Sequence, residues 1–535
     1  MNLITVCKDL REFVNNIPVN LFLLPKNRFL GVVKTYITNI LQYLELTVSK
    51  YPEKTAFSDG LEDLSFRQLY DRARAVGSFL SLRGYYKEPI IVFADKKPNT
   101  IAMLMGIIYA GCFYVCLDSE MPQSRLELIL ASLEPRAIVY DKKSENAAAN
   151  LSTDIQKYLF DDICDSDVDK GILSSVRERQ IDTDQIYITF TSGSTGTPKG
   201  VSASHRSVID YTETLCEALG FDESTIFANQ TPLFYDAPLK EIMTTLKLGC
   251  RTYFVPKRLF MFPIKLCEYL NDNRINTLCW VVSALVMISS FGALEKNKPR
   301  YLSKICFGSE VFPKLEYNKW RAAYPNASFV NLYGPTEATG MSCYWIANRK
   351  LDEKEAIPIG RPFRNTEIIL LDELGKRSYC KGEICIRGSC LTLGYFNDRE
   401  KTDEAFVQNP CNSNYAELVY RTGDIGEYNS HGELVFLGRK DSQIKLMGHR
   451  IELGELESIA SSAEGVSRAC AVYDDNKKKI FLYFTGKISE EKLIEYMRGF
   501  LPRQILPSAC IRLDGMPLTP NGKIDRLFLK RLIMT

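Results

Sequence analysis

The chain has 535 residues, a formal net charge of +2, 45% hydrophobic residues and 25% charged residues. One hydrophobic core rarely serves a chain of this length, so we expect at least two domains. The composition is ordinary for a soluble globular protein, and the small net charge gives no reason to expect nucleic acid as a partner. The sequence holds no apolar run long enough to span a membrane.

The cysteines and histidines narrow the chemistry further. The sixteen cysteines are scattered singly without a CxxC pair, and the N-terminus does not resemble a secretory signal. We therefore expect reduced thiols and a cytoplasmic location. The three histidines, His205, His431 and His449, are too few to favour a histidine metal cluster or a Ser-His-Asp triad.

Apolar periodicity predicts alternating helices and strands after an N-terminal extension at residues 1–38, in which residues 9–15 have helical character. Ser65 is a suitable N-cap for the second predicted helix after this extension. Strands that alternate with helices of this length favour parallel α/β layers. In chain order we expect a helix at 40–51, a strand at 55–57, a helix at 65–82, a strand at 89–94, a helix at 100–110, strands at 113–117 and 186–190, a helix at 240–248, strands at 470–473 and 480–484, and helices at 489–500 and 526–533.

The stretch at residues 188–201, ITFTSGSTGTPKGV, combines an apolar strand with a loop rich in glycine and hydroxyl groups. Glycines let backbone N–H groups approach an anion, hydroxyls can donate to phosphate oxygens, and Lys199 supplies a positive charge. The stretch is not a Walker A loop, because Gly200 follows the lysine where Ser or Thr is required. Taken alone, the loop is also compatible with a flexible surface turn.

Three further stretches place reactive side chains in turns. Residues 331–339 (NLYGPTEAT) hold Glu337, whose carboxylate suits Mg²⁺, a hard cation that prefers oxygen ligands. Residues 420–426 (YRTGDIG) hold Asp424, and a carboxylate can accept from two vicinal hydroxyls. Residues 517–526 (PLTPNGKIDR) hold Lys523 in an Asn-Gly turn, which by itself predicts only a solvated lysine.

These motifs, in this order, resemble those of the adenylate-forming superfamily, which includes acyl-CoA synthetases, luciferases and nonribosomal-peptide adenylation domains. The resemblance runs from about residue 40 to the C-terminus. Residues 450–457 (RIELGELE) are closer to amino-acid activators, and parts of residues 308–339 also resemble D-alanine–carrier-protein ligases. The resemblance implies an α/β fold: a large domain of α/β layers with a β-rich subdomain at residues 39–440, and a small mobile α+β domain at 441–535, with Asp441 as the hinge.

The resemblance also implies a role for individual residues. Lys523 would be the catalytic lysine that bridges the substrate carboxylate and the α-phosphate, with Thr336 near the phosphates and Glu337 as the Mg²⁺ ligand. Asp236 would pair with the α-ammonium group of an amino acid, although an Asp before a helix is often only an N-cap. ATP would be held by Thr191, Ser192, Gly193, Ser194, Thr195, Gly196, Lys199, Tyr333, Asp424 and Arg439, and the substrate pocket would comprise Asp236, Ala237, Lys240, Cys279, Ile305, Phe307, Leu332, Gly340 and Met341.

The pocket residues bear on the choice of amino acid. Phe307, Leu332 and Met341 are bulky, which favours a small substrate side chain. Lys240 departs from D-alanine–carrier-protein ligases, in which this position is apolar. We expect its side chain to point to solvent; the alternative is that it pairs with an acidic side chain of the substrate.

The resulting hypothesis is a monomeric, AMP-forming amino acid–carrier protein ligase that uses ATP and Mg²⁺. Because the chain ends soon after Lys523, we expect a carrier protein with a phosphopantetheine arm to act in trans. One alternative is an acyl-CoA synthetase-like ligase that forms a CoA thioester, against which Asp236 argues. Another is a catalytically silent nucleotide-binding homologue, against which the presence of Lys523, Glu337 and Asp424 argues. The sequence leaves open the amino acid, its chirality and the pathway.

Overall fold

The computed structural model describes residues 36–151, 154–192, 197–352, 355–440, 443–518 and 524–534. Residues 1–37 and 38–535 are separate units, and only the second is described below. The helical character expected at residues 9–15 lies outside the described residues. No helix in the described ranges has the length and apolar character needed to cross a bilayer.

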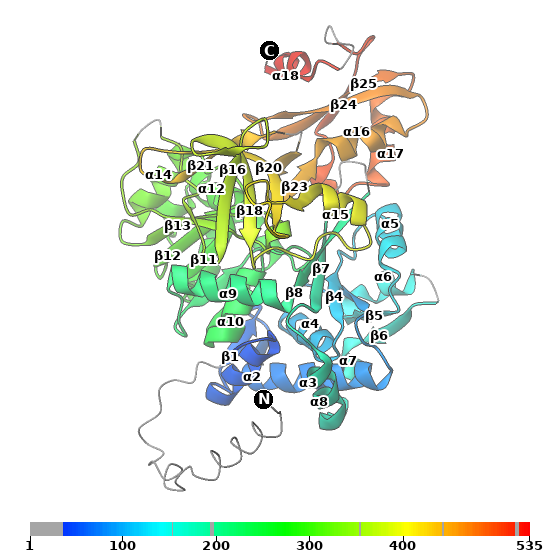
Figure 1. Ribbon diagram of the computed structural model, residues 1–535, viewed down its shortest axis with the longest axis vertical. Helices are drawn as coiled ribbons and strands as arrows, with labels where there is room; N and C mark the ends of the chain where they lie inside the picture. Colours follow the sequence, from blue (N-terminus) through cyan, green and yellow to red (C-terminus); the bar gives the residue numbers. More distant parts are fainter. Residues whose placement is uncertain are drawn as a thin grey trace, which may run out of the picture. The chain divides into compact units, whose positions relative to one another are not determined.

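A six-stranded sheet carries the predicted phosphate loop (Figure 1). All of its neighbouring strands are parallel except β7 and β8, which form a hairpin that pairs Thr191 with Lys199. The predicted phosphate loop therefore lies between these two paired strands in the chain. In spatial order the strands are β6 (Gln156–Leu159), β5 (Ala137–Tyr140), β3 (Pro89–Phe93), β4 (Phe113–Cys116), β7 (Gln185–Thr191) and β8 (Lys199–Ser204).

A nine-stranded sheet carries the remaining motifs of the large domain. The six strands from β1 to β13 in spatial order are parallel, with antiparallel strands at both edges. Ligand sites of such sheets form beyond the carboxyl ends of the strands. The order is β15 (Arg361–Pro362), β14 (Cys343–Ile346), β13 (Ser328–Tyr333), β12 (Lys304–Gly308), β11 (Thr277–Val281), β9 (Ile226–Asn229), β10 (Arg251–Phe254), β1 (Thr55–Ser58) and β2 (Asp63–Ser65).

Helices α2, α3, α4, α9 and α10 contact one another and form a helical layer. Helix α4 is apolar on every side and almost wholly buried, as expected for an interior helix. Ser65 caps α3 in a capping box with Gln68, which confirms the predicted N-cap. The helices of the large domain are α2 (Leu41–Lys50), α3 (Phe66–Leu82), α4 (Pro98–Tyr109), α5 (Gln123–Leu133), α6 (Glu145–Ala149), α7 (Phe160–Ile163), α8 (Lys170–Arg179), α9 (His205–Leu219), α10 (Leu239–Leu248), α11 (Pro263–Asp272), α12 (Val282–Ser290), α13 (Ala293–Lys296), α14 (Lys314–Ala323) and α15 (Arg399–Ala405), with 3₁₀ turns η2 (Lys142–Ser144), η3 (Lys257–Met261) and η4 (Thr336–Ala338).

An antiparallel sheet follows the α/β layers and forms the predicted β-rich subdomain. Its longest strand, β20, carries Asp424 and pairs with β18, β19 and β21. The strands are β17 (Arg377–Ser378), β16 (Thr366–Leu371), β18 (Lys381–Gly388), β20 (Leu418–Tyr428) and β19 (Phe406–Gln408), with β21 (Leu434–Arg439) beside β20.

The C-terminal part is a small α+β unit with its own hydrophobic core. The predicted strands and helices here are confirmed, with longer strands than expected, because the antiparallel pairing of β24 with β25 continues beyond the apolar segments. The fold class predicted from the sequence is thus confirmed. The elements are the β22 (Gln443–Leu446)–β23 (His449–Glu452) hairpin, α16 (Leu453–Ser461), β24 (Val466–Asp474), β25 (Lys479–Gly486), α17 (Glu490–Arg498), η5 (Arg503–Ile505), β26 (Ala509–Arg512) and α18 (Arg526–Met534).

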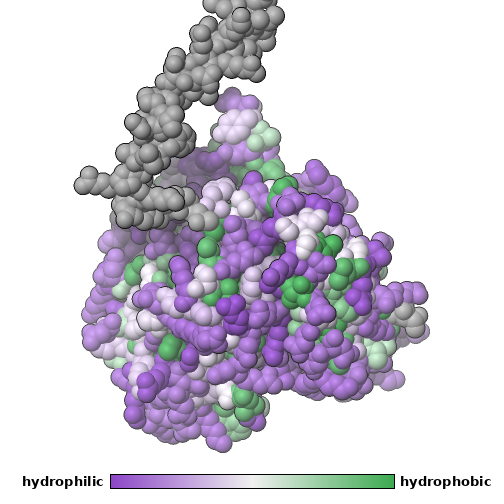
Figure 2. Space-filling model, turned by 90° about the horizontal axis from the view of Figure 1, so that it is seen from below, coloured by the Kyte–Doolittle hydropathy of each residue, from purple (hydrophilic) through white to green (hydrophobic). Residues whose placement is uncertain are grey.

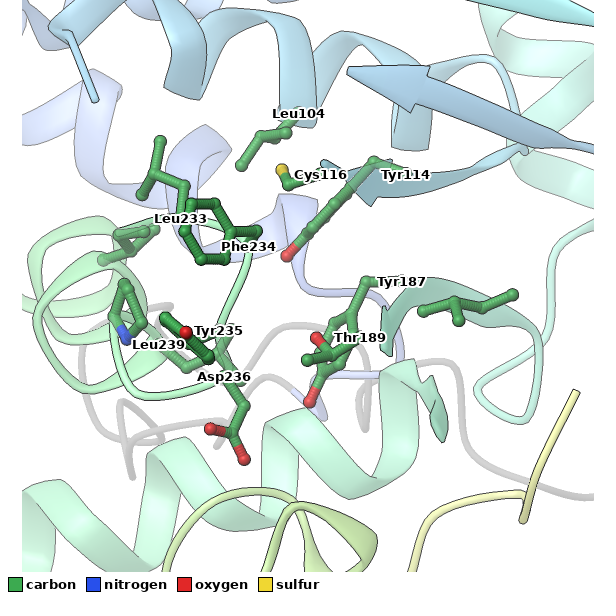
Figure 3. A pocket seen from close by; sticks show the side chains of 13 residues that line it. Leu104, Tyr114, Cys116, Tyr187, Thr189, Leu233, Phe234, Tyr235, Asp236 and Leu239 are labelled. Atoms are coloured by element: carbon green, nitrogen blue, oxygen red, sulfur yellow. The ribbon is translucent and has the colours of Figure 1, made fainter. Parts of the chain in front are cut away.

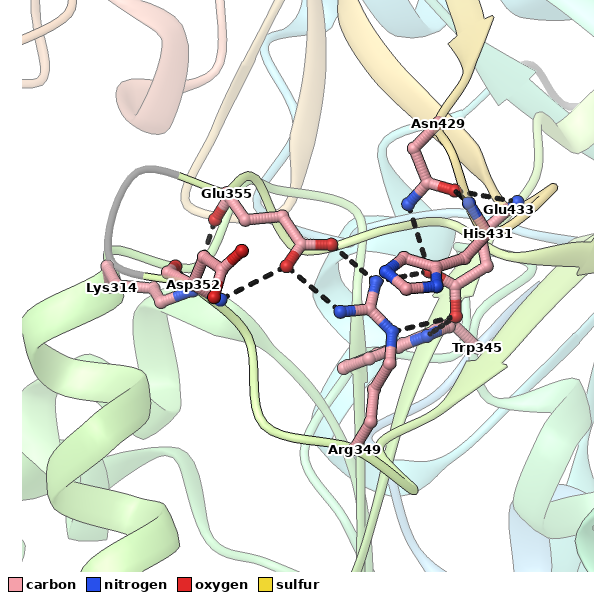
Figure 4. Close-up of polar contacts among 8 residues, drawn as sticks. All are labelled: Lys314, Trp345, Arg349, Asp352, Glu355, Asn429, His431 and Glu433. Carbon is pink, nitrogen blue, oxygen red and sulfur yellow. Dashed lines mark hydrogen bonds and ion pairs between the residues drawn. The ribbon is translucent and has the colours of Figure 1, made fainter.

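A cluster of charges fastens the segment after β14 to the β20–β21 hairpin (Figure 4). Arg349 forms ion pairs with Glu355 and with Glu433, the latter at 2.5 Å. Glu433 also accepts from the Trp345 indole at 2.8 Å and the Asn429 amide at 3.0 Å.

The face shown in Figure 2 is mostly hydrophilic, with its hydrophobic residues in small groups.

Candidate active site

One large cavity of about 780 Å³ brings the separate sequence motifs together. It lies beyond the carboxyl ends of parallel strands of the nine-stranded sheet, where the fold predicts a ligand site. Residues from both sheets, the β-rich subdomain and the small C-terminal unit line it. Among them are Thr191 and Ser192, Asp236 and Ala237, Thr336, Gly340 and Met341, Asp424 and Arg439, and Lys445, Gly448, His449 and Arg450.

The two ends of the predicted phosphate loop have different surroundings. Thr191 lines the cavity, and its hydroxyl is buried without a hydrogen-bond partner in the described structure. Ser192 donates to the backbone oxygen of Arg450 at 2.8 Å. Lys199 lies behind the cavity wall, with Nζ 5.2 Å from the centre of the Tyr395 ring, and burial lowers the pKa of its ammonium group. The four predicted residues Gly193, Ser194, Thr195 and Gly196 lie outside the described residues.

Glu337 is fully buried in the 3₁₀ turn η4, directly after β13. Its carboxylate accepts from the Tyr395 hydroxyl at 2.8 Å and from the Arg450 guanidinium at 2.6 Å. Burial alone would raise the pKa of this carboxyl, but the charges of Arg450 and Lys199 outweigh burial and lower the pKa to about 2. The Glu337 carboxylate is therefore ionised at neutral pH.

Tyr333 and Asp424 meet across the boundary between the nine-stranded sheet and the β-rich subdomain. The Tyr333 hydroxyl donates to one Asp424 oxygen at 2.5 Å, and the Arg439 guanidinium contacts the other. Lys445 Nζ lies 5.8 Å from the centre of the Tyr333 ring. Burial lowers the pKa of Lys445, and the neighbouring Asp424 opposes that effect. Sequence reasoning placed Tyr333, Asp424 and Arg439 among the residues that hold ATP, and the structure brings all three together.

Asp236 lies in the loop between β9 and α10, at the junction of the main cavity with a small side cavity of about 20 Å³. In Figure 3 the side chains of Tyr187 and Asp236 extend from opposite walls of this side cavity. Burial raises the pKa of the Asp236 carboxyl, while the Thr336 hydroxyl and Lys240 oppose the increase. The residue before α10 is Pro238, and no side chain caps this helix. The alternative that Asp236 is an N-cap is therefore wrong, since the cap position is Pro238 and Asp236 lines both cavities.

The deep end of the cavity is a recess of about 10 Å³ that matches most of the predicted substrate pocket. Its wall includes Ala237, Lys240, Cys279, Phe307, Leu332 and Met341. The expectation that Lys240 points to solvent is wrong: its side chain is 5% exposed, because α10 turns this position toward the recess. Gly340 lines the main cavity instead, and Ile305 is buried in the core of the sheet.

The small C-terminal unit closes part of the cavity. The two-residue turn Met447–Gly448 joins β22 to β23 with positive φ at both residues, as a tight hairpin requires. Gly448 N–H donates to Glu310 at 3.1 Å, and a Cβ built on Gly448 would lie 2.8 Å from Val281. There is therefore no room for a side chain at position 448, which accounts for the glycine there. The turn packs closely against the large domain.

Two further pairs join the C-terminal unit to the large domain. The Tyr235 hydroxyl is hydrogen-bonded to Nδ1 of His449, and Arg125 forms an ion pair with the fully buried Glu455. Sequence reasoning missed Tyr235, Tyr395 and Arg450 as site residues, although Tyr235 directly precedes Asp236 and Arg450 begins the recognised stretch 450–457. Lys523 and Asp441 lie outside the described residues. In the described ranges no three His, Cys, Asp or Glu side chains gather in a metal-binding group.

The chain belongs to the family of AMP-binding enzymes, whose model matches residues 44–396. Gramicidin S synthase 1 of Brevibacillus brevis is 30% identical over 91% of this chain and 44% of its own length. The chain spans less than half the length of the first curated relatives that it matches.

Solved structures have the same fold. The structure of holo-PA1221, a nonribosomal peptide synthetase protein with adenylation and PCP domains, superposes with a TM-score of 0.78 at 24% identity, over 92% of this chain and 84% of that one. Holo-AB3403, a four-domain nonribosomal peptide synthetase bound to AMP and glycine, gives a TM-score of 0.66 at 27% identity, over 91% of this chain and 36% of that one.

Proposed function

We propose that this chain activates an amino acid with ATP and transfers it to the phosphopantetheine thiol of a carrier protein. In the first step the amino-acid carboxylate attacks the α-phosphate of ATP, and pyrophosphate leaves. In the second step the thiol attacks the acyl carbon, and AMP leaves. The family assignment and the AMP and glycine bound to AB3403 support the first step. The PCP domain in PA1221 supports a carrier as the acceptor.

The observation that carries the proposal is that Asp236, with its carboxylate buried, lines the same cavity as Thr191, Thr336 and Asp424. A desolvated ammonium group requires a carboxylate, because an unpaired buried charge is costly. Asp236 would hold the substrate ammonium and thereby direct the substrate carboxylate toward the phosphates.

Residues around the cavity would divide the binding of ATP between them. The unpartnered Thr191 hydroxyl would donate to a phosphate oxygen, together with Ser192, Lys199 and the loop residues Gly193, Ser194, Thr195 and Gly196. Tyr333, Asp424 and Arg439 would hold the adenosine. Lys523 would bridge the reacting carboxylate and phosphate, because two anions must approach each other.

Glu337 would hold Mg²⁺, with Thr336 beside it. The ionised carboxylate is the hard oxygen ligand that this cation prefers. Mg²⁺ bound there would neutralise charge on the phosphates of ATP. In the described arrangement the same carboxylate accepts from Arg450, so Mg²⁺ and Arg450 would compete for it.

Residues 441–535 would rotate about Asp441 between the two steps. This rotation would remove Lys523 from the active site and bring the β22–β23 turn into it. The position of Gly448 and His449 in the cavity wall supports assigning the described arrangement to the thioester step. Rotation of a small domain about a few loop residues is a common way to reuse one site.

The small recess supports an amino acid with a short side chain, as in D-alanine–carrier-protein ligases, although Lys240 departs from them. All fifteen cysteines in the described ranges are free thiols, which supports a cytoplasmic location.

The second candidate is an acyl-CoA synthetase-like ligase. An ATP–pyrophosphate exchange assay over the twenty amino acids, both alanine enantiomers and a set of aliphatic and aryl acids tests the two. Exchange with at least one amino acid supports the proposal. Exchange with simple acids alone favours the second candidate, and no exchange with any acid favours a silent homologue.

A further inference from the structure

The recess at the deep end of the cavity contains one charged side chain, that of Lys240. The recess is continuous with the main cavity, because Thr231, Ala237, Val281, Ser309 and Met341 line both. The other side chains in its wall are hydroxyls, thiols, aliphatic groups and aromatic rings. A group bound there would therefore contact a single ammonium ion in an otherwise uncharged pocket.

Lys240 has hydrogen-bonding capacity to spare. It lies in the first turn of α10, and its Nζ donates to the backbone oxygen of Ala237 at 2.8 Å. An ammonium group has three donors. Among the described residues no carboxylate lies within ion-pair distance of Lys240, although its charge influences both Asp236 and Glu241. A buried ammonium of this kind is costly unless a counter-charge reaches it.

The charges of Asp236 and Lys240 offset each other without substrate. They no longer do so when an amino acid with a neutral side chain binds. In the empty site the charge of Asp236 offsets that of Lys240 through space. The α-ammonium group of a substrate would form an ion pair with Asp236, and the α-carboxylate of the substrate must point toward ATP. A neutral side chain would leave Lys240 without a counter-charge, whereas a side-chain carboxylate would restore the balance.

Glu241 is the other group that could supply a negative charge. It is 1% exposed and does not line the recess, and burial raises the pKa of its carboxyl to about 7. The charge of Lys240 opposes this increase most strongly, and Asn229 and the charge of Lys96 oppose it further. Burial therefore disfavours its ionised form, and its charge acts on Lys96 as well as on Lys240.

We propose that the recess binds the side-chain carboxylate of a short acidic amino acid, with the Lys240 ammonium as its partner. This inference rests on the proposed function. A recess of about 10 Å³ has room for little more than one water-sized group. The carboxymethyl group of aspartate is the shortest acidic side chain among the standard amino acids, so aspartate fits better than glutamate.

The test is ATP–pyrophosphate exchange with aspartate, asparagine, glutamate and alanine, as both enantiomers, on the full chain. The wild-type chain should use one enantiomer of aspartate with kcat/KM at least about tenfold above asparagine, which has nearly the same shape. Lys240→Met should abolish that preference, and Lys240→Arg should retain it in part. Lys265→Met, which removes an exposed lysine on α11 that lines none of these cavities, is the matched control and should leave the preference unchanged.

The outcomes separate this inference from the function on which it rests. Exchange with alanine or asparagine in preference to aspartate in the wild-type chain would overturn the inference and leave the amino-acid ligase intact. Equal loss of activity toward all amino acids in Lys240→Met would also contradict it, because Lys240 would then act only as the counter-ion of Asp236. The comparison of aspartate with asparagine needs no variant, so it decides the matter even if Lys240→Met fails to fold.

Discussion

Arg450 donates to the Glu337 carboxylate at 2.6 Å, although the two residues are 113 positions apart in the chain. Glu337 belongs to the large domain and Arg450 to the β22–β23 hairpin of the C-terminal unit. The pair therefore forms only while that hairpin lies over the cavity. If Glu337 also holds Mg²⁺, the metal and the arginine compete for one carboxylate.

Arg450→Ala should therefore separate the two half-reactions. We expect transfer of the aminoacyl group to pantetheine to fall about tenfold to hundredfold, because the closed arrangement loses a buried ion pair. Adenylation, measured by ATP–pyrophosphate exchange, should change by no more than about threefold, because under the proposed rotation Arg450 would leave Glu337 in that step. An equal fall in both rates would show that Arg450 does not distinguish the two arrangements.

Gly448 offers a steric test of the same arrangement. Gly448→Ala would put a Cβ 2.8 Å from Val281 at a φ of +81°, so the turn should no longer seat against the large domain. Transfer to pantetheine should fall while exchange is retained. Gly432→Ala is the control: φ is +70° there, but no atom lies within 4 Å of the added Cβ. If both variants lose transfer equally, backbone strain and not contact with Val281 is responsible.

More of the fold than of the candidate site could be predicted from the sequence. Strands, helices and the Ser65 cap follow from local patterns, so the layered fold could be predicted. The meeting of Tyr333 with Asp424 was predictable only through the resemblance to a family, because the two residues come from different sheets. The burial of Lys240 was missed because a lysine near a helix start is usually solvated, and only the packing of α10 turns it inward.

The contacts of Tyr235 and Arg450 could not be predicted from the sequence. Each joins the C-terminal unit to the large domain, and that relationship depends on how two folded units dock. No periodicity or turn signal in a single sequence carries this information.

The Arg349 cluster predicts an acid-dependent contribution to stability. Hydrogen bonds from Arg349 lower the pKa of Glu355 to about 2 from its ordinary value of 4.5. Because the folded-state pKa is depressed, the contribution is complete above the unfolded pKa and is lost as the pH falls from about 4.5 toward 2. Solvent access limits its size to about 1 kcal/mol.

Arg349→Ala should lower the free energy of unfolding at pH 7 by about that amount, and by less at pH 3, in urea titrations. Arg399→Ala, which removes an exposed ion pair within α15, is the control and should have almost no effect. A loss that is the same at both pH values would mean that packing of Arg349, and not its charge, stabilises the segment.

Lys523→Ala tests the catalytic residue that the resemblance implies. We expect exchange to fall by about a thousandfold or more, because the lysine would act mainly in the transition state. The thermal unfolding midpoint should remain within about 2 °C of the wild-type value, since the sequence predicts a solvated lysine in an Asn-Gly turn. Exchange within a few-fold of wild type would remove Lys523 from the mechanism.

The central claim is that Asp236 recognises the amino group of the substrate. The direct measurement is ATP–pyrophosphate exchange with the best amino acid and its des-amino analogue, in the wild-type chain and in Asp236→Ala. We predict that the wild-type chain strongly prefers the amino acid. In the variant, the activation free energy for kcat/KM with the amino acid should rise by about 3–5 kcal/mol. The variant should use the des-amino acid at least as well as the wild-type chain does. A wild-type chain that already prefers the des-amino acid would contradict the account.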